Sequence, residues 1–222
     1  SGSNGFAIRV TLNAYNNRFY NNTISTIGPT GAGVLFNNVA YNNYFYSNTI
    51  NTNFTNGYGV ALVLNAYNNS VYDNIITTRG ELGFGVMLNN TVYNNYVYSN
   101  KVTTHGVNSM GIRLSETVNN NNIYSNNVTT NGSISTGILL RDVAFSNLVY
   151  SNIIVTYNES SSGIGLAINV YNNTIYSNNV TALNATKSGG IILVSYVNNN
   201  TFYKNMIFSL SAGILINGTT SV

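Results

Sequence analysis

A ten-residue phrase recurs along the chain at an almost constant interval. It reads YNNRFYNNTI from Tyr15 to Ile24 and YNNYFYSNTI from Tyr41 to Ile50, 26 residues further on. Later copies keep this interval except the last, which begins after 27 residues; they start at Tyr67, Tyr93, Asn119, Phe145, Tyr171 and Asn198. A fixed period of this size predicts a repeat architecture in which each unit stacks on its neighbours.

The spacing of apolar residues inside each repeat predicts short strands. Apolar residues stand one, three, twelve and seventeen positions after each repeat start, and Gly, Asn and Ser separate these segments. Apolar residues two positions apart are typical of strands, and no segment keeps the 3.6-residue period of a helix. We expect two or three strands per repeat, with repeats starting near Ala7, Gly33, Gly59, Gly85, Gly111, Gly137, Gly163, Gly190 and Gly213.

Stacked repeats of this kind predict a parallel β-helix. One repeat cannot bury its apolar stripe alone, whereas a stack buries it continuously, with equivalent strands ~4.8 Å apart. We therefore expect an all-β fold and one solenoid domain over residues 1–222, with eight to nine coils of 26 residues. Leucine-rich repeats have similar periods, but they need several Leu per repeat and Leu is sparse here.

Two columns of asparagine never vary, and both have inward parity or lie at corners of the coil. An Asn amide carries donors and an acceptor, so equivalent side chains can hydrogen-bond along the stack, whereas Asp would place like charges every ~4.8 Å. Asn also tolerates the left-handed backbone of tight corners. We interpret these residues as structural ladders, not as catalytic groups. The first column contains Asn17, Asn43, Asn69, Asn95, Asn121, Asn147, Asn173 and Asn200, and the second contains Asn22, Asn48, Asn74, Asn100, Asn126, Asn152, Asn178 and Asn205.

These columns carry a resemblance to a known family. The spacing N-x-[FIV]-x-x-N-x-[IV], preceded by G-[IV]-x-[LF], resembles the repeats of right-handed parallel β-helix proteins from Ala7 to about Gly218. It is similar to pectate-lyase-like and NosD-like chains and to adhesin-like surface proteins of archaea and bacteria. The resemblance implies a single-stranded, right-handed β-helix. It implies little about activity, because the family includes lyases, hydrolases, adhesins and fibre proteins.

A third invariant column consists of tyrosines whose parity points outward. The structural interpretation is a stacked aromatic ladder, and the functional one is an aromatic stripe for glycan stacking or lateral packing of rods. The ladder contains Tyr20, Tyr46, Tyr72, Tyr98, Tyr124, Tyr150, Tyr176 and Tyr203. An imperfect second stripe contains Tyr15, Tyr41, Tyr67, Tyr93, Phe145 and Tyr171.

Threonines form a further rank whose regularity is typical of ice-binding surfaces. Adjacent strand residues face opposite sides, so only one of two neighbouring Thr columns can face outward, and it also holds Ser25, Asn51, Val155 and Phe208. The β-propensity of Thr explains the rank without ice binding. The two columns contain Thr26, Thr52, Thr78, Thr104, Thr130 and Thr156, and Thr77, Thr103 and Thr129.

Groups suited to catalysis are scarce. Glu116 and Asp142 share a column, so we expect them on adjacent coils ~5 Å apart, a separation that suits a retaining glycosidase. Arg113 and Arg141 stand nearby, which favours a surface ion-pair cluster instead. His105 falls in a variable turn and is expected to face solvent. The sequence offers no acidic cage or His cluster, so we expect no metal and no cofactor.

Charge and hydropathy exclude other classes of partner. The net charge of +3 comes without any basic run, so the sequence gives only weak evidence for nucleic-acid binding. Apolar residues are scattered, and no segment approaches the ~18 consecutive apolar residues of a membrane span. The absence of Cys excludes disulfides and thiolate metal sites.

Variable turns occupy one corner of every coil and carry N-glycosylation sequons. Loop sequons could be glycosylated, whereas a ladder amide would have to leave its stack. This pattern favours an extracellular or cell-surface location and possible glycan partners. The loop sequons are at Asn53, Asn131, Asn158 and Asn184.

The sequence leaves three functional hypotheses open, and the first of them depends on the two ends of the chain. Neither end carries a capping helix, so we expect either a piece of a longer protein or copies that meet head to tail. The first hypothesis is a non-enzymatic structural or adhesive rod, a fibre or cell-surface component whose copies associate end to end. The second is a carbohydrate-binding adhesin that uses the Tyr stripes or variable loops. The third is a polysaccharide lyase or glycoside hydrolase centred on Glu116 and Asp142.

Overall fold

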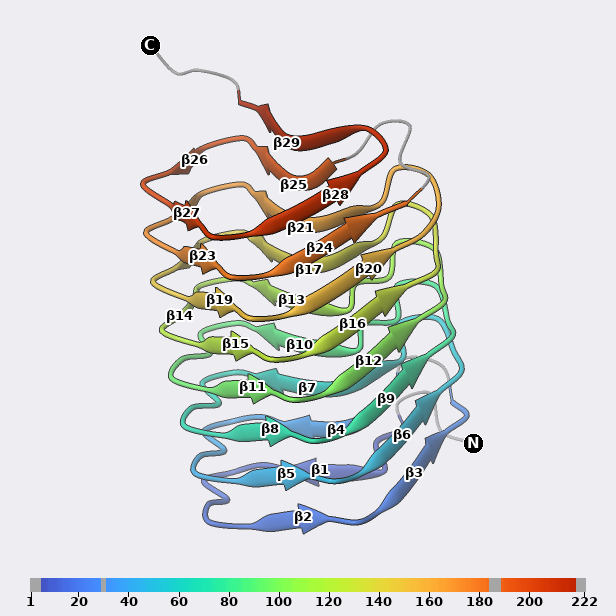
Figure 1. Ribbon diagram of the computed structural model, residues 1–222. Coiled ribbons are helices and arrows are strands. Elements are labelled where there is room, and N and C mark those ends of the chain that lie inside the picture. The colour runs from blue at the N-terminus through green and yellow to red at the C-terminus, as the bar shows by residue number, and fades with distance from the viewer. Residues whose placement is uncertain (1–4, 29–30, 184–188, 219–222) are drawn as a thin grey trace.

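The computed structural model describes residues 5–28, 31–183 and 189–218. The chain winds as a solenoid with strands on every side and no helix in these ranges (Figure 1). It crosses the front from left to right, returns behind from right to left and rises with each coil, which is a right-handed path (Figure 1). All strand pairs are parallel, so the prediction of a right-handed parallel β-helix is confirmed.

Two long sheets form opposite walls of the solenoid. Sheet A has nine strands and sheet C has eight. Sheet A contains β1 (Ile8–Val10), β4 (Ala32–Phe36), β7 (Tyr58–Val63), β10 (Val86–Asn89), β13 (Ile112–Ser115), β17 (Thr136–Arg141), β21 (Ser162–Ala167), β25 (Gly189–Val194) and β29 (Ala212–Asn217). Sheet C contains β2 (Arg18–Tyr20), β5 (Tyr44–Tyr46), β8 (Ser70–Tyr72), β11 (Tyr96–Tyr98), β15 (Asn122–Tyr124), β19 (Leu148–Tyr150), β23 (Thr174–Tyr176) and β27 (Thr201–Tyr203).

A third long sheet and a short one complete each coil. Sheet D has eight strands and sheet B has four, and isolated bridges from Tyr15 to Asn119 extend sheet B toward the first coil. Sheet D contains β3 (Thr23–Thr26), β6 (Thr49–Thr52), β9 (Ile75–Thr78), β12 (Lys101–Thr104), β16 (Asn127–Thr130), β20 (Ile153–Thr156), β24 (Asn179–Ala182) and β28 (Met206–Ser209). Sheet B contains β14 (Val118–Asn119), β18 (Ala144–Phe145), β22 (Val170–Tyr171) and β26 (Val197–Asn198).

The core consists of the predicted apolar columns. Val86 pairs in register with Ile112, and Val97 with Ile123, so equivalent residues of successive coils lie on each other. These side chains are fully buried and belong to one continuous cluster along the rod. Stacking therefore buries what a single coil would expose.

Glycine at the repeat starts is explained by close packing across the coil. A Cβ at Gly111 would lie 2.2 Å from Val128 Cγ1 and 2.6 Å from the carbonyl oxygen of Gly137. The same conflict recurs at Gly85 and Gly137. Sheets A and D approach so closely here that no side chain fits between them.

The left-handed corners lie one residue before the position that the sequence indicated. Asn94 and Ser99 have φ of 56° and 54°, and each precedes a ladder residue, Asn95 or Asn100. The ladder asparagines themselves are absent from the positive-φ residues, so their predicted role in left-handed corners is wrong. The first Asn of the YNN phrase accepts the αL conformation, which leaves the second Asn free to point into the core.

Candidate interaction surface and the ladders behind it

The two asparagine columns form continuous hydrogen-bonded ladders inside the solenoid. Asn43 donates to Asn69 Oδ1 from its backbone N at 3.0 Å and from Nδ2 at 3.1 Å. Asn43 Nδ2 also donates to the carbonyl oxygens of Tyr41 and Ala14, at 3.0 and 2.9 Å. Each buried amide thus ties its own corner to the coil before and the coil after. The predicted ladders are present.

Both ladders have a direction. Each Asn donates to the Oδ1 atom of the next coil toward the C-terminus, so the last amides, Asn200 and Asn205, receive bonds on their Oδ1 atoms. At the opposite end Asn17 and Asn22 donate to Asn43 and Asn48. In the described part of the chain no donor reaches Oδ1 of Asn17 or Asn22, so one end presents acceptors and the other presents N–H groups.

A third, shorter ladder of serines lies at the variable corner, and the sequence interpretation missed it. Ser135 Oγ accepts the backbone N–H of Ser109 at 3.2 Å, and Ser161 Oγ accepts that of Ser135 at 3.2 Å. Each hydroxyl donates to a glycine carbonyl of the preceding coil, as Ser161 does to Gly132 at 3.0 Å. The signal in the sequence is only three serines at the 26-residue spacing.

The tyrosine column forms a stack of parallel rings on the outside of sheet C. Successive centroids lie 4.8–5.1 Å apart with interplanar angles of 1–7°. Exposure is greatest at the two ends, at 52% for Tyr20 and 43% for Tyr203. Burial, with the neighbouring phenols of Tyr124 and Tyr72, raises the pKa of Tyr98 to about 12. The predicted surface ladder is therefore present as a continuous stack from Tyr20 to Tyr203.

The second stripe is stacked in two pieces. Tyr15, Tyr41, Tyr67 and Tyr93 form one run with centroids 5.0–5.1 Å apart. Phe145 and Tyr171 form another pair at 5.2 Å. Asn119 interrupts the stripe between the two runs.

Threonine forms an inner column, not an outer face. Thr52, Thr78, Thr104, Thr130 and Thr156 are buried, while Thr77, Thr103 and Thr129 on the other side of sheet D are half-buried. Thr78 Oγ1 donates to the Gly83 carbonyl at 2.9 Å, whereas Thr104 Oγ1 is buried with no partner in the described ranges.

Glu116 and Asp142 occupy equivalent corners of adjacent coils, joined by a bond of 3.2 Å from Thr117 N to the Asp142 carbonyl. Both side chains have protein partners. Glu116 Oε2 accepts from Asn89 Nδ2 at 3.0 Å, and Asp142 Oδ2 forms an ion pair with Arg141 Nε at 2.6 Å. Among the described residues the ion pair is limited to Arg141 and Asp142, and Glu116 has an amide partner in place of an arginine.

An apolar cluster on the outer face of sheet A borders these charges and was not predicted. It contains Ala32, Leu35, Ala61, Phe84 and Met87, with Tyr58, Val63 and Met110 against it. The Arg113 guanidinium lies 5.0 Å from the Phe84 ring centroid, and burial, then the Arg141 charge, lowers the pKa of Arg113. Ala32, Tyr58, Phe84 and Met110 occupy equivalent positions of successive coils. Because the residue type changes from coil to coil, the repeat pattern did not reveal this cluster.

The variable corner carries the predicted sequons in different settings. Asn53 and Asn158 are exposed and Asn131 is half-buried, whereas Asn184 lies outside the described residues. His105 is exposed as predicted, and its Nδ1 lies 3.3 Å from Asn131 Nδ2. A shallow polar hollow follows this corner, lined by His105, Asn131, Asn158 and Glu159 among others. In the parts of the chain that the structure covers, no group of three or more metal-ligating side chains converges, and no helix could span a membrane.

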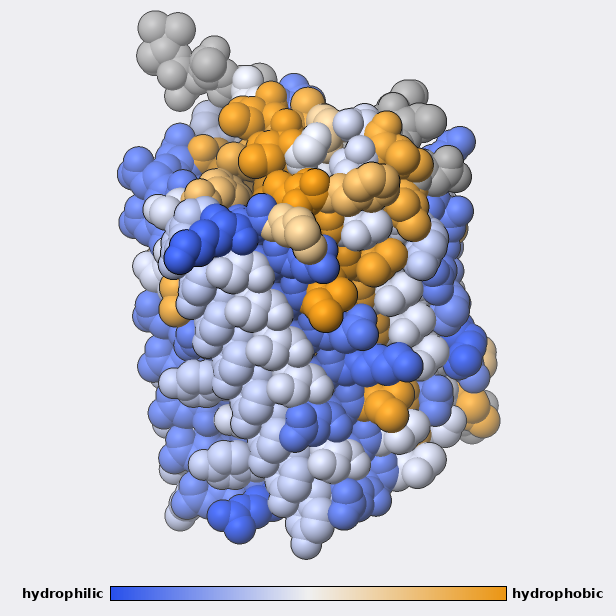
Figure 2. Space-filling view, in the orientation of Figure 1, coloured by the Kyte–Doolittle hydropathy of each residue, from blue (hydrophilic) through white to orange (hydrophobic). Residues whose placement is uncertain are grey.

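Apolar side chains gather over the last coil, at the C-terminal end of the rod (Figure 2). The exposed residues there are Met206, Phe208, Leu210, Ile214 and Ile216. Below this patch the face in this view is mostly polar or pale, with scattered apolar side chains toward its right-hand side (Figure 2).

Comparisons with known proteins leave the function open. No protein-family model matches the chain, and no curated protein matches it. Among solved structures, the periplasmic alginate epimerase AlgG is similar at 14% identity and a TM-score of 0.48, covering 89% of this chain and 55% of the AlgG chain. A point mutant of AlgG gives 15% identity and a TM-score of 0.49. The A-module of the Azotobacter vinelandii mannuronan C-5 epimerase AlgE4 gives 9% identity and a TM-score of 0.30, covering 90% of this chain and 91% of that one.

Proposed function

We propose that this protein is a non-enzymatic structural rod whose copies join end to end. The observation that carries the proposal is the complementarity of the first and last described coils. The last coil exposes Ile216 at 72% and Phe208 at 57%. The Nδ2 groups of Asn200 and Asn205 donate back, to the carbonyl oxygens of Asn198 and Ile175, while the backbone amide N–H groups of the two residues have no acceptor among the described residues. The first coil offers Oδ1 of Asn17 and Asn22 to such amides.

A head-to-tail joint would continue the columns of sheets C and D, including both asparagine ladders beside them. Tyr203 would stack on Tyr20 of the next copy at the ~4.8 Å rise of parallel strands. A contact of this kind does not close on itself, so it propagates into a filament. Tail-to-tail contacts would instead set N–H groups against N–H groups.

The experiment is negative-stain microscopy with light scattering of residues 1–222 across a concentration series. We expect rods that lengthen with concentration in unit steps. Ile216→Lys should stop the lengthening, whereas Ile153→Lys should not, because Ile153 is 50% exposed on the side of the rod in sheet D. Particles of one rod length at every concentration would contradict the proposal.

The proposal extends to location. Asn53 and Asn158 are exposed sequons at the variable corner, and Asp, Glu, Lys and Arg make up only 6% of the chain. Both features suit an extracellular or cell-surface protein whose loops accept glycans. Mass spectrometry of the native protein tests this: glycan at Asn53 or Asn158 supports it, and retention inside the cell counts against it.

Carbohydrate binding is the second candidate, because the tyrosine ladder presents a row of ring edges and hydroxyl groups along sheet C. Aromatic side chains supply apolar area with a hydroxyl at its rim, which suits the faces of sugars. A glycan array tests this candidate. Binding that is lost in Tyr98→Ala but kept in Tyr98→Phe would support it, and binding that is unchanged in Tyr98→Ala would count against it.

A polysaccharide-active enzyme is the third candidate, and it rests on Glu116 and Asp142. The Asn89 and Arg141 partners satisfy these carboxyl groups without a substrate, which weakens this candidate. Turnover of any polysaccharide that is abolished by Glu116→Gln would revive it. Absence of turnover over a broad panel agrees with the structural rod.

A further inference from the structure

The YNN corner, where the YNN phrase turns the chain into sheet C, carries sequons of its own. The first Asn of the phrase stands in a sequon wherever the residue two positions later is Ser or Thr, which is the case at Asn68, Asn172 and Asn199. We propose that Asn68 and Asn172 carry N-linked glycans beside the second tyrosine stripe. These sites rest on the proposed extracellular location and lie outside the variable corner.

Strand alternation keeps the ladder asparagines out of sequons. Two positions after a ladder Asn the chain points inward again, as at Val71 after Asn69, and this position is apolar in every coil. The first Asn of the phrase comes one residue earlier, so the sequon of Asn68 ends on Ser70, an outward residue of β8. The residues that can accept a glycan are therefore never the ones that hold the ladder together.

Asn68 and Asn172 present their side-chain amides on the outside of the rod. Both residues are exposed and have a left-handed backbone, with φ of 54° and 57°. Within the described ranges neither side-chain amide makes a hydrogen bond, whereas the ladder amides of Asn69 and Asn173 each donate to two or more acceptors. Strands β8 and β23 are paired on both sides, so this exposure belongs to the flank of the rod.

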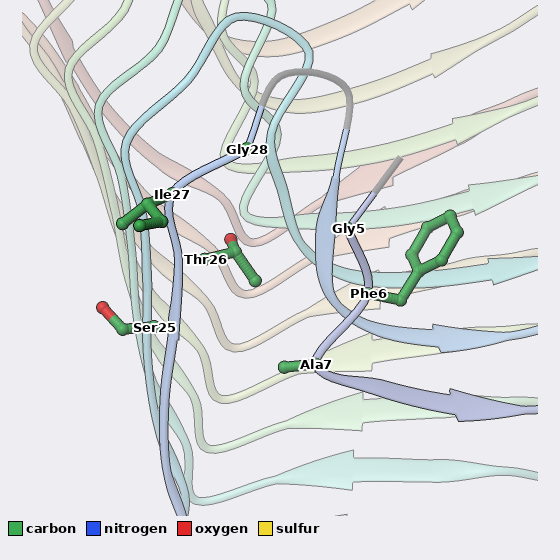
Figure 3. Close-up of a pocket in the computed structure, with 7 residues that line it drawn as sticks. All are labelled: Gly5, Phe6, Ala7, Ser25, Thr26, Ile27 and Gly28. Atoms are coloured by element: carbon green, nitrogen blue, oxygen red, sulfur yellow. The ribbon is translucent and has the colours of Figure 1, made fainter. Parts of the chain in front are cut away.

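The variable corner holds its asparagines differently. Asn131 Nδ2 lies 3.3 Å from His105 Nδ1, and Asn158 Nδ2 donates to the Asn131 carbonyl. These residues line a hollow of about 490 Å³. Another hollow at this corner, of about 320 Å³, separates residues 5–7 from residues 25–28 (Figure 3). Side chains of the variable corner thus turn toward one another across concave surfaces, unlike the two amides at the YNN corner.

The modification transfers an oligosaccharide from a lipid carrier, and an oligosaccharyltransferase catalyses it. Nδ2 of the Asn forms a bond to the anomeric carbon of the sugar and loses a proton. The bond between that carbon and the lipid phosphate breaks, and the lipid phosphate leaves. The sequon also requires a hydroxyl two positions after the Asn, which Ser70 and Thr174 supply. Because the folded rod keeps both Asn residues outside, the bulky glycan is compatible with the fold.

Each piece of the second tyrosine stripe has one of these sites beside it. Asn68 follows Tyr67 in the run of four rings, and Asn172 follows Tyr171 in the pair of rings. The two sites are four periods of 26 residues apart, which is ~19 Å along the rod. Exposed aromatic rows favour contact with other molecules. Hydrated glycans at these positions would keep rods from packing side by side through the stripe.

Peptide mapping by mass spectrometry tests both sites in the whole chain, secreted from a host that attaches N-glycans. Secretion is then imposed and does not depend on the native location. We expect glycans at Asn68 and Asn172. Ser70→Ala should abolish the first and Thr174→Ala the second, and both changes concern outward residues. Unmodified Asn68 and Asn172 in the secreted chain would overturn the two sites whatever the native location.

A sequon moved to another coil tests the corner without the two natural sites. Tyr96→Thr creates a sequon at Asn94, which is exposed with φ of 56° at the same corner, and we expect a new glycan there. Val97→Thr is the matched control, because it creates a sequon at the buried ladder residue Asn95. The secreted chain that is folded by circular dichroism should carry no glycan at Asn95. An unmodified Asn94 would contradict the role of the corner.

The width of the rods tests the effect on side-by-side packing. Negative-stain microscopy of the glycosylated chain should show rods of single width, and the double variant Ser70→Ala, Thr174→Ala should show rods associated laterally. Rods of single width from both would overturn this effect. In the native protein, export without glycans at Asn68 and Asn172 would overturn the sites alone, whereas retention inside the cell would overturn the proposed location.

Discussion

The carboxamide oxygen of Asn121 accepts two hydrogen bonds from Asn95, one from the backbone N at 2.9 Å and one from Nδ2 at 3.0 Å. Both residues are fully buried. The same contact recurs from coil to coil, so each amide oxygen serves two donors and each amide nitrogen joins two coils. Loss of one amide leaves buried partners unpaired on both sides.

Asn95→Ala should therefore lower the free energy of unfolding by about 3 kcal/mol or more, since each buried group left unpaired costs about 1–3 kcal/mol. Urea unfolding followed by circular dichroism measures the change. Asn122→Ala is the matched control, because Asn122 points outward in β15 and should stay within about 0.5 kcal/mol. Equal losses in the two variants would contradict the ladder energetics.

Gly111→Ala should destabilise the fold by about 1–3 kcal/mol or more, the usual range for overpacking. The added methyl would conflict with both Val128 and the Gly137 carbonyl, and the backbone atom cannot rotate away. Gly213→Ala, at the same repeat position, has nothing within 4 Å and should leave thermal unfolding of the dilute protein unchanged. A harmless Gly111→Ala would show that sheets A and D can separate freely.

Thr104→Val should stabilise the protein by about 1 kcal/mol, because it removes a buried hydroxyl without a partner and keeps the shape. Thr78→Val should do the opposite by a similar amount, since Thr78 donates to Gly83 at 2.9 Å. Chemical denaturation of both variants gives the comparison. The same sign in both would contradict the hydrogen-bond assignment.

The tyrosine ladder should make the fold sensitive to alkali. The pKa of Tyr98 is raised to about 12 in the folded protein, so the folded state keeps a proton that the unfolded state loses near its usual pKa of about 10. Stability is therefore fully present below pH ~10 and falls as the pH rises through 12. Unfolding followed between pH 8 and pH 12 measures this loss, and Tyr98→Phe should make it smaller. Identical pH profiles for the two proteins would contradict the assignment.

The stacked architecture and both asparagine ladders could be predicted because a 26-residue period repeats every constraint many times. Asn43 and Asn69 are in contact because every coil places the same residue at the same corner. The left-handed residues were misplaced by one position, since Asn94 and Asn95 are the same residue type and only backbone geometry distinguishes them. Side chains alternate between the two faces of a strand, and this alternation predicted both the outward tyrosine ladder and the inward apolar core.

Features carried by few coils escaped prediction. The serine ladder at Ser109, Ser135 and Ser161 occupies a column that holds glycine in earlier coils. The outer cluster around Phe84 depends on side chains of different types meeting across strands. The repeat-start glycines were recognised as a pattern, but the reason for them is the distance between sheets A and D, which no single strand encodes.

The glycine column has a consequence for how such a chain can change in length. Every coil meets its neighbours through the same amide, the same bare backbone position and the same apolar residues. A segment of one full period, removed or copied between two repeat starts such as Gly85 and Gly111, returns each contact to an equivalent partner. Recombination between the repeated segments of the gene would thus shorten or extend the rod by whole turns and leave its interior intact.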